Sequence, residues 1–204
     1  MKPGETHHHS GRSPGIPSQA QKSIVSQREI SSDTESYVVA LRSSLRQSPD
    51  VILLGEMRDF ETMSIAMTAA ETGHLVLSTL HTLGAANTID RIIDVFPPNQ
   101  QRQIAIQLSS VLQAVVSQQL IPSADESGMH AAFELMTATP AIRNMIRENK
   151  IPQIDGLVYS SSSDTMFSMD SSIQTLCRTG QITKEEALPC GQFRNAKEEN
   201  FSIT

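Results

Sequence analysis

Apolar and polar residues alternate in runs of different length along the chain, and these runs predict its helices and strands. Two short apolar runs, 50–55 and 74–79, have the length and composition of buried strands. Between them, residues 60–72 are rich in Ala and Met and predict a helix that ends at Gly73. Because a helix between two buried strands is typical of a βαβ unit, we predict an α/β fold with a parallel sheet.

The flanking segments add further elements to this unit. In residues 23–30, apolar and polar side chains alternate, which predicts a strand. A helix is predicted after it and should end before Pro49. Downstream, apolar residues at helical spacing predict helices over 84–95 and 99–119. Residues 116–121 also fit one strand of a hairpin with 129–136. Four more helices are predicted, at 140–148, 152–161, 170–179 and 183–187.

The composition divides the chain into four parts. Pro, Gly, Ser and other polar residues without an apolar period predict a disordered or non-homologous tail at the start. A core with the pattern of a nucleotide-binding α/β domain follows, and then a region with a returning strand and helices. The predicted parts are 1–22, 23–122, 123–188 and a second tail at 189–204.

Charge and cysteine content exclude several classes of function. The net charge of -6 provides no basic field, so a nucleic-acid partner is not expected. Cys177 and Cys190 are interpreted as free thiols, and His7, His8 and His9 in a polar tail predict no metal site. No apolar run approaches the ~20 residues that span a bilayer. We therefore expect a cytoplasmic protein that reaches a membrane only through partners.

Charged residues crowd the end of the first buried strand. Glu56, Arg58 and Asp59 follow the run 50–55 directly, and His81 follows the next strand. In parallel α/β sheets, ligands bind at the carboxyl ends of the strands, which meet at one edge. Glu56 could orient a water or reach the Mg²⁺ shell of a nucleotide, or it could mark where the strand meets solvent. His81 could bond Glu56 or sense a phosphate, or it could be a solvated loop histidine.

Arginines form a second candidate group. Arg42 and Arg46 are spaced i, i+4 and should share a helix face, with Arg28 upstream. They could present guanidinium groups to phosphates, or they could form a solvated basic face. A phosphate-binding loop of the G-x-x-x-x-G-K-[ST] type is missing, because none of the ten glycines is followed by lysine.

Several motifs together resemble one family. The stretch LRQSPDVILLGEMRD (45–59) resembles the signature of the secretion ATPases that drive type II secretion and type IV pili. The stretch ETGHLVLSTLHT (71–82) resembles their histidine box, and residues 88–122 follow it as they do in the family. The stretch TPAIRNMIRENK (139–150) resembles a motif of the pilus retraction, or twitching motility, branch. The resemblance extends from Ser23 to Ala187.

This resemblance implies a fold and a set of roles. It implies a partial RecA-like P-loop ATPase core with a parallel sheet, followed by a mostly helical region. Glu56 is then the catalytic glutamate of an atypical Walker B motif, and His81 couples the nucleotide state to conformation. Arginines are implied to contact the nucleotide, in part from a neighbouring subunit: Arg28, Arg42, Arg46 and Arg58. Retraction is linked to Ala141, Ile142, Arg143, Asn144, Ile146 and Arg147.

The resemblance also implies partners and cofactors. It implies a hexamer that hydrolyses ATP with Mg²⁺ and acts on a pilus platform protein at the cytoplasmic face of the inner membrane. The family's Walker A loop should lie before Ser23, where 22 unrelated residues stand. We therefore expect the C-terminal half of such a motor, from a truncated gene or a misassigned reading frame, without ATPase activity of its own. The alternative is a catalytically dead remnant that binds the hexamer or the platform.

Overall fold

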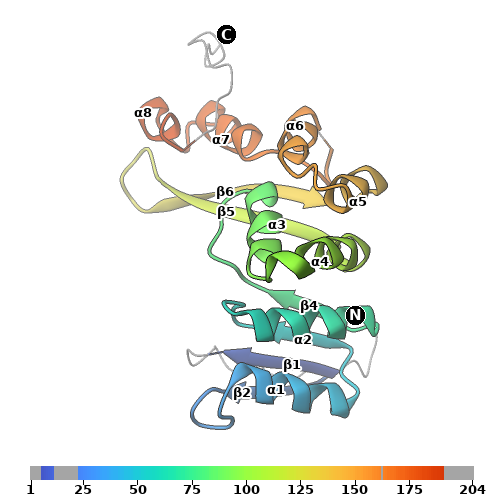
Figure 1. Ribbon diagram of the computed structural model, residues 1–204. Coiled ribbons are helices and arrows are strands. Elements are labelled where there is room, and N and C mark those ends of the chain that lie inside the picture. Colours follow the sequence, from blue (N-terminus) through green and yellow to red (C-terminus); the bar gives the residue numbers. More distant parts are fainter. Residues whose placement is uncertain (1–5, 12–22, 162, 191–204) are drawn as a thin grey trace. The chain divides into compact units, whose positions relative to one another are not determined.

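The computed structural model describes residues 6–11, 23–161 and 163–190 (Figure 1). Contacts divide the chain into two compact units. Unit 1 takes in the chain up to His81 together with Asp94–Val111, and unit 2 takes in Thr82–Ile93 and the chain from Leu112. The sequence placed a boundary after Pro122, whereas the structure assigns the segment from Leu112 to Pro122 to unit 2.

A parallel sheet forms the centre of unit 1. Its four strands are β1 (Thr6–Gly11), β2 (Ile24–Glu29), β3 (Val51–Leu54) and β4 (Leu75–Ser78), in the order β2-β1-β3-β4. Adjacent strands are parallel in every pair, and the β3–β4 register runs from Val51↔Leu75 to Leu54↔Ser78. The predicted strands in 23–30, 50–55 and 74–79 and the predicted parallel sheet are therefore confirmed.

Strand β1 corrects the prediction of a disordered N-terminal tail. Thr6–Gly11 pairs with β2 on one side and β3 on the other, so a disordered tail is wrong for these residues. The other alternative for 1–22, a non-homologous tail, stays a prediction. Its sequence, THHHSG, has no apolar period from which a strand could be inferred. Pairing on both sides satisfies the backbone groups of a strand whatever its side chains are. The other residues of the predicted tail, and 191–204 of the C-terminal one, lie outside the described residues.

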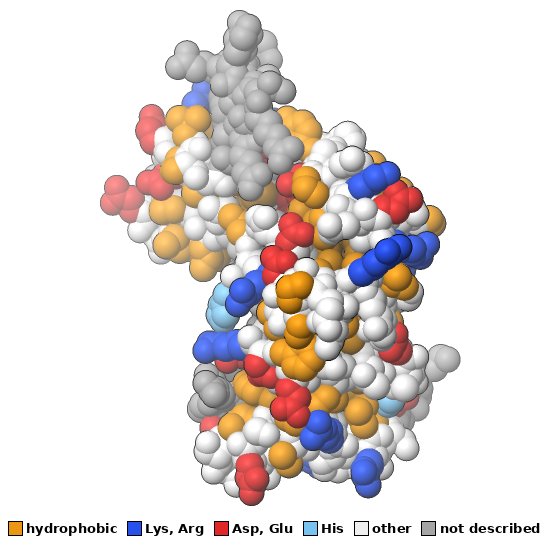
Figure 2. All heavy atoms as spheres, in the orientation of Figure 1, with side chains coloured by type: hydrophobic (Ala, Val, Ile, Leu, Met, Phe, Trp, Pro, Cys, Tyr) orange, Lys and Arg blue, Asp and Glu red, His pale blue; other side chains and the backbone are white. Residues whose placement is uncertain are grey.

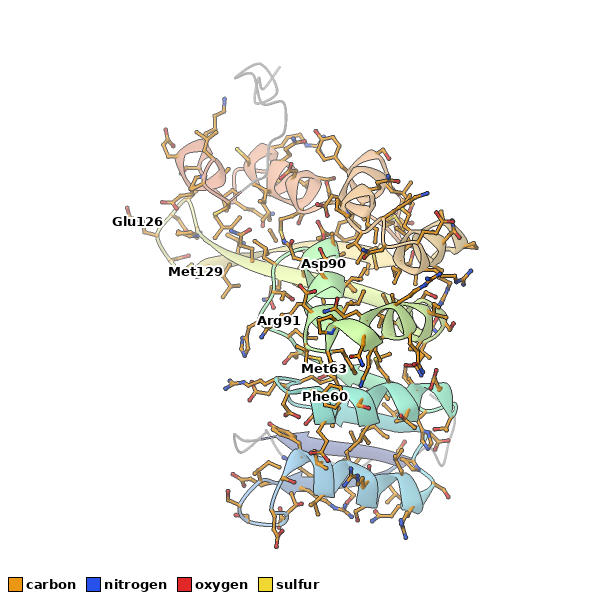
Figure 3. All side chains as sticks on the ribbon, viewed as in Figure 1. Phe60, Met63, Asp90, Arg91, Glu126 and Met129 are labelled. Atoms are coloured by element: carbon orange, nitrogen blue, oxygen red, sulfur yellow. The ribbon has the colours of Figure 1, made fainter. Side chains whose placement is uncertain are left out.

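Two helices cover one face of this sheet (Figure 1). They are α1 (Tyr37–Ser44), which continues as the short 3-10 helix η1 (Leu45–Gln47), and α2 (Phe60–Glu71). Apolar side chains from both helices and from β3 form a buried cluster of Leu41, Ile52, Leu54, Ala66 and Ala69. Helix α4 (Pro98–Val111) contacts α2, and the rings of Phe60 and Phe96 pack edge to face at 5.0 Å (Figure 3 labels Phe60).

Unit 2 is built on a two-stranded hairpin. β5 (Ala114–Pro122) and β6 (Met129–Thr137) pair antiparallel, and Figure 3 labels Glu126 and Met129 at the turn between them. The predicted strand at 129–136 is confirmed. Five helices complete the described part of the unit: α3 (Ala85–Asp94), α5 (Pro140–Arg147), α6 (Pro152–Ser160), α7 (Met169–Arg178) and α8 (Lys184–Ala187). Its core includes the buried residues Ile121, Ala132, Ile173, Cys177 and Ala187.

The long helix predicted over 99–119 was wrong beyond Val111, whereas the alternative hairpin is confirmed. Helix α4 ends at Val111, and Ala114 begins strand β5. Buried Val115 and Ser117 alternate with exposed Val116 and Gln118, which is the period of a strand rather than of a helix. The adjacent β-branched residues Val115 and Val116 also favour the extended conformation. Tertiary pairing with β6 therefore decided a segment whose apolar residues fit both periods.

Candidate active site

The candidate site lies at the carboxyl edge of β3 and β4. The ladder between these strands ends at the pair Leu54↔Ser78, and both chains leave the sheet at the same level. Glu56 stands two residues beyond Leu54, and His81 stands three beyond Ser78. Parallel pairing therefore brings together two side chains that are 25 positions apart in sequence.

Two donors converge on one oxygen of Glu56. Arg58 Nε donates to Glu56 Oε2 at 2.6 Å, and His81 Nε2 lies 3.3 Å from the same oxygen. The Glu56 side chain is 15% exposed, whereas those of Arg58 and His81 are 60% and 78% exposed. Among the described residues, Glu56 Oε1 makes no hydrogen bond. The carboxylate is thus held through one oxygen, and its second oxygen can accept a bond from a water or a ligand.

The surroundings of Glu56 favour its charged form. Burial raises the pKa of the carboxyl, but hydrogen bonds from Arg58 and His81 and their positive charges lower it more. The net result is a pKa below the ordinary value of 4.5. At neutral pH Glu56 is therefore a carboxylate that can accept a hydrogen bond or a proton.

The neighbouring charges in the stretch after β3 have separate tasks. Asp59 is the N-cap of α2: its Oδ1 accepts from Thr62 N at 2.8 Å, and its Oδ2 accepts from Thr62 Oγ1 at 2.9 Å. Arg58 instead donates to Glu56. One charge starts the next helix and two belong to the site, which explains why three charges crowd the end of a buried strand.

The three upstream arginines lie in separate elements. Arg28 is in β2 and donates to Ala40 O at 3.5 Å, a long contact. Arg42 is in α1 and pairs with Glu61 of α2 at 3.0 Å. Arg46 is in η1, after α1 has ended, so the two residues predicted to share one helix face lie in two helices. Within the described chain, none of the three has a hydrogen bond or ion pair with Glu56.

The segment predicted to serve retraction forms helix α5. Thr139 caps it by accepting from Ile142 N at 3.4 Å, and Pro140 occupies its first turn. Ile142 and Ile146 are fully buried. The other four residues of the motif lie at the surface or partly exposed, namely Ala141, Arg143, Asn144 and Arg147. The helix is therefore anchored by its isoleucines and presents polar side chains, and basic side chains gather on this side of unit 2 in Figure 2.

Sequence reasoning missed a second glutamate, Glu134 of β6. Its Oε1 accepts from Ala85 N, at the start of α3, at 2.8 Å, and the N–H of Met169, at the start of α7, also donates to it. Burial raises its pKa above 4.5, the charges of Asp155 and Asp170 add to this effect, and the two N–H groups oppose it. A single glutamate inside the apolar strand MHAAFELM was the available signal.

The described residues lack two further features, a metal-binding cluster and a membrane-spanning helix. They include no group of three or more His, Cys, Asp or Glu side chains arranged to hold a metal ion. In the same part of the chain, no helix combines the length and the apolar character needed to cross a bilayer.

Comparison with known proteins identifies relatives on both sequence and structure. A twitching motility protein of Neisseria gonorrhoeae is 51% identical over 169 residues, which are 83% of this chain and 45% of that protein. The type IV pilus retraction ATPase PilT of Pseudomonas aeruginosa is 48% identical over 83% of this chain and 49% of its own length. The chain thus spans about half the length of the curated relatives it matches.

The fold agrees with these relatives. A crystal structure of the pilus retraction motor PilT with bound ADP aligns over 96% of this chain and 54% of that one, with a TM-score of 0.85 and 42% identity. The α/β class with a parallel sheet is therefore confirmed. A model of the type II/IV secretion system protein family matches residues 18–179, and the chain belongs to this family.

Proposed function

We propose that this chain forms the catalytic-carboxylate edge of the ATP-hydrolysing site of a pilus retraction motor. The observation that carries the proposal is the geometry of Glu56, whose Oε2 is held by Arg58 and His81 while Oε1 makes no bond within the described chain. Such a carboxylate can accept a hydrogen bond from a water and aim it at a phosphoryl group. The family and the relatives named for pilus retraction support the reaction and its use.

Each residue of the site has a proposed task. Glu56 orients the attacking water and accepts its proton, and His81 senses the state of the nucleotide through its bond to Glu56. Arg58 keeps Glu56 ionised and belongs with Arg28, Arg42 and Arg46 to the groups that contact the nucleotide. When bound, Mg²⁺ would neutralise phosphate charge, and Glu56 suits its outer shell through water rather than a protein-built metal cage.

The motor assembly is also a proposal. We place the chain in a hexamer at the cytoplasmic face of the inner membrane, where it acts on a pilus platform protein. The exposed polar residues of α5 are the part of unit 2 that suits this contact, because they lie at the surface while the buried Ile142 and Ile146 anchor the helix. Arg28, Arg42 and Arg46, which have no hydrogen bond or ion pair with Glu56 in the described chain, can then contact nucleotide across a subunit boundary.

The isolated chain should not hydrolyse ATP. Glycine and lysine of a phosphate-binding loop supply much of the electrostatic clamp on a triphosphate, and this sequence has no glycine followed by lysine. We expect phosphate release by the purified chain at the level of the buffer. Hydrolysis by the chain that disappears in Glu56→Gln would contradict this expectation.

A chimera tests the role of Glu56. Residues 23–187 replace the matching segment of the Pseudomonas aeruginosa relative, which then supplies its own remaining half. We expect the chimera to hydrolyse ATP, and Glu56→Gln to lower kcat about 10²- to 10⁴-fold, the usual contribution of a general base. Glu185→Gln, an exposed residue of α8, is the matched control and should change nothing. A folded chimera that keeps its rate in Glu56→Gln would refute the proposal.

A second candidate function is a catalytically dead remnant that binds the hexamer or the platform. The surface-exposed Asn144 and Arg147 on an intact α5 favour it. Tagged chain should then retain the full-length relative or the platform protein in a pull-down, and Arg147→Ala should weaken retention more than the control Lys184→Ala. Equal loss in both variants, or no retention at all, would rule this function out.

A further inference from the structure

We propose that Thr79 is a positioning residue that fixes the backbone on both sides of Glu56 and thereby holds the Glu56 carboxylate against His81. The importance of Thr79 for catalysis rests on the proposed function, whereas its effect on the position of Glu56 does not. Thr79 is the first residue of the chain beyond the β3–β4 ladder, which ends at Leu54↔Ser78. No role in the proposed chemistry has been given to it above.

Two hydrogen bonds of Thr79 flank Glu56. Thr79 Oγ1 donates to Gly55 O at 2.5 Å, and Met57 N donates to Thr79 O at 3.1 Å. The first bond holds the peptide group that precedes the Glu56 Cα, and the second holds the peptide group that follows it. A single residue of the neighbouring strand segment therefore restrains both peptide planes next to Glu56.

This restraint fixes the direction of the Glu56 side chain. Only φ and ψ can rotate between two planar peptide groups, so holding both groups sets the Cα–Cβ direction. Thr79 also lies two residues before His81 in the same segment, so it ties the two partners to one reference point. The 3.3 Å contact between His81 Nε2 and Glu56 Oε2 is near the limit of a hydrogen bond, and a small displacement would break it.

The hydroxyl is the part of this arrangement that a substitution can remove. The bond from Met57 N goes to the main chain of Thr79 and survives any side chain, and Met57 itself packs against the buried cluster of unit 1. The bond to Gly55 O needs an O–H donor. Thr79 is exposed, so loss of its hydroxyl should disturb Glu56 without unfolding the sheet.

Titration of Glu56 in the 204-residue chain tests the proposal. The carboxyl carbon of Glu56 is followed by NMR against pH in the unsubstituted chain, Thr79→Val and Thr79→Ser. In Thr79→Val, which keeps the shape and loses the donor, we expect the midpoint of Glu56 to rise towards that of an ordinary glutamate. In Thr79→Ser, which keeps the donor, we expect the midpoint of the unsubstituted chain.

Two results would overturn the proposal: an unchanged Glu56 midpoint in Thr79→Val, or an equal rise in Thr79→Ser. If Thr79→Val does not fold, Thr79→Ala removes the same hydroxyl with a smaller side chain and is read in the same way. The titration requires no nucleotide. A chimera without Glu56-dependent hydrolysis would therefore refute the proposed function and leave the role of Thr79 standing, and an unchanged titration would do the reverse.

Discussion

The two glutamates Glu56 and Glu134 are held in opposite ways. Glu56 of unit 1 is held by side chains, an arginine and a histidine that are both mostly exposed. Glu134 of unit 2 is held by backbone N–H groups at the starts of α3 and α7 and is partly buried. The pKa of the first lies below 4.5 and that of the second above it. The difference teaches that charged, exposed side-chain partners keep a carboxylate accessible to a ligand. Backbone donors around a partly buried carboxylate instead make it a structural joint, that is, a residue that links helices α3 and α7 to strand β6.

Replacement of Glu134 should have the largest effect on stability. Glu134→Ala leaves the N–H groups of Ala85 and Met169 without their acceptor inside the protein, so we expect a loss of about 1–3 kcal/mol in the free energy of unfolding. Urea unfolding followed by circular dichroism measures it. Glu126→Ala, at the exposed tip of the hairpin, is the control and should unfold as the unsubstituted chain does. A loss no greater than in Glu56→Gln would remove the distinction between joint and site.

Removal of the cap of α2 should follow in size. Asp59→Ala deletes both bonds to Thr62 and should cost about 1 kcal/mol of unfolding free energy. Asp59→Asn keeps an oxygen that can accept from Thr62 N and should stay close to the unsubstituted chain. If the two variants lost equal stability, Asp59 would act through its charge rather than as a cap, and it would belong with Glu56 and Arg58.

The pH dependence of stability should separate the two glutamates by its sign. The pKa of Glu56 is lowered by folding, so its contribution to stability is present above 4.5 and is lost as pH falls through the folded-state pKa. The pKa of Glu134 is raised, so its contribution falls as pH rises from 4.5 towards the folded-state pKa. The urea midpoint of each variant is measured across this pH range. Glu56→Gln should lose the part of the pH dependence in which stability falls towards acid pH, and Glu134→Gln should lose the part in which stability falls as pH rises. Parallel curves would contradict the assignment.

The surface ion pair between Arg42 and Glu61 should contribute least to the free energy of unfolding. Arg42 and Glu61 are more than half exposed, so we expect Arg42→Ala to cost at most about 1 kcal/mol, and less in high salt. A double-mutant cycle with Glu61→Ala, at low and at high salt, measures the interaction. A large, salt-independent interaction energy would show that this pair stabilises unit 1 as a structural contact rather than as a solvent-screened one.

Much of unit 1 follows from the sequence because its signals are local. Two apolar runs of strand length and the helix between them predict the parallel pairing, and pairing alone brings Glu56 beside His81. The role of Asp59 as a cap was not predicted, because it depends on the conformation of the turn between β3 and α2.

What the sequence could not provide depends on contacts between distant segments. Strand β1 has polar side chains and is defined by its two neighbours, not by an apolar pattern. The residues Ala114–Gln119 satisfy helical and strand periods alike, and the partner β6 decides between them. Glu134 gains its importance only where α3 and α7 begin beside it. The two-unit division is equally non-local, because Asp94–Val111 returns to unit 1.

The place of β1 between β2 and β3 has a consequence for how the chain folds. His7 pairs with Val51, so closing this contact encloses about forty residues, at an entropic cost that local pairs avoid. The β5–β6 hairpin, closed by the short turn between Pro122 and Met129, can form within microseconds. When the whole chain refolds from denaturant, assembly of the sheet beside Glu56 should therefore be the slow step, after the hairpin has formed.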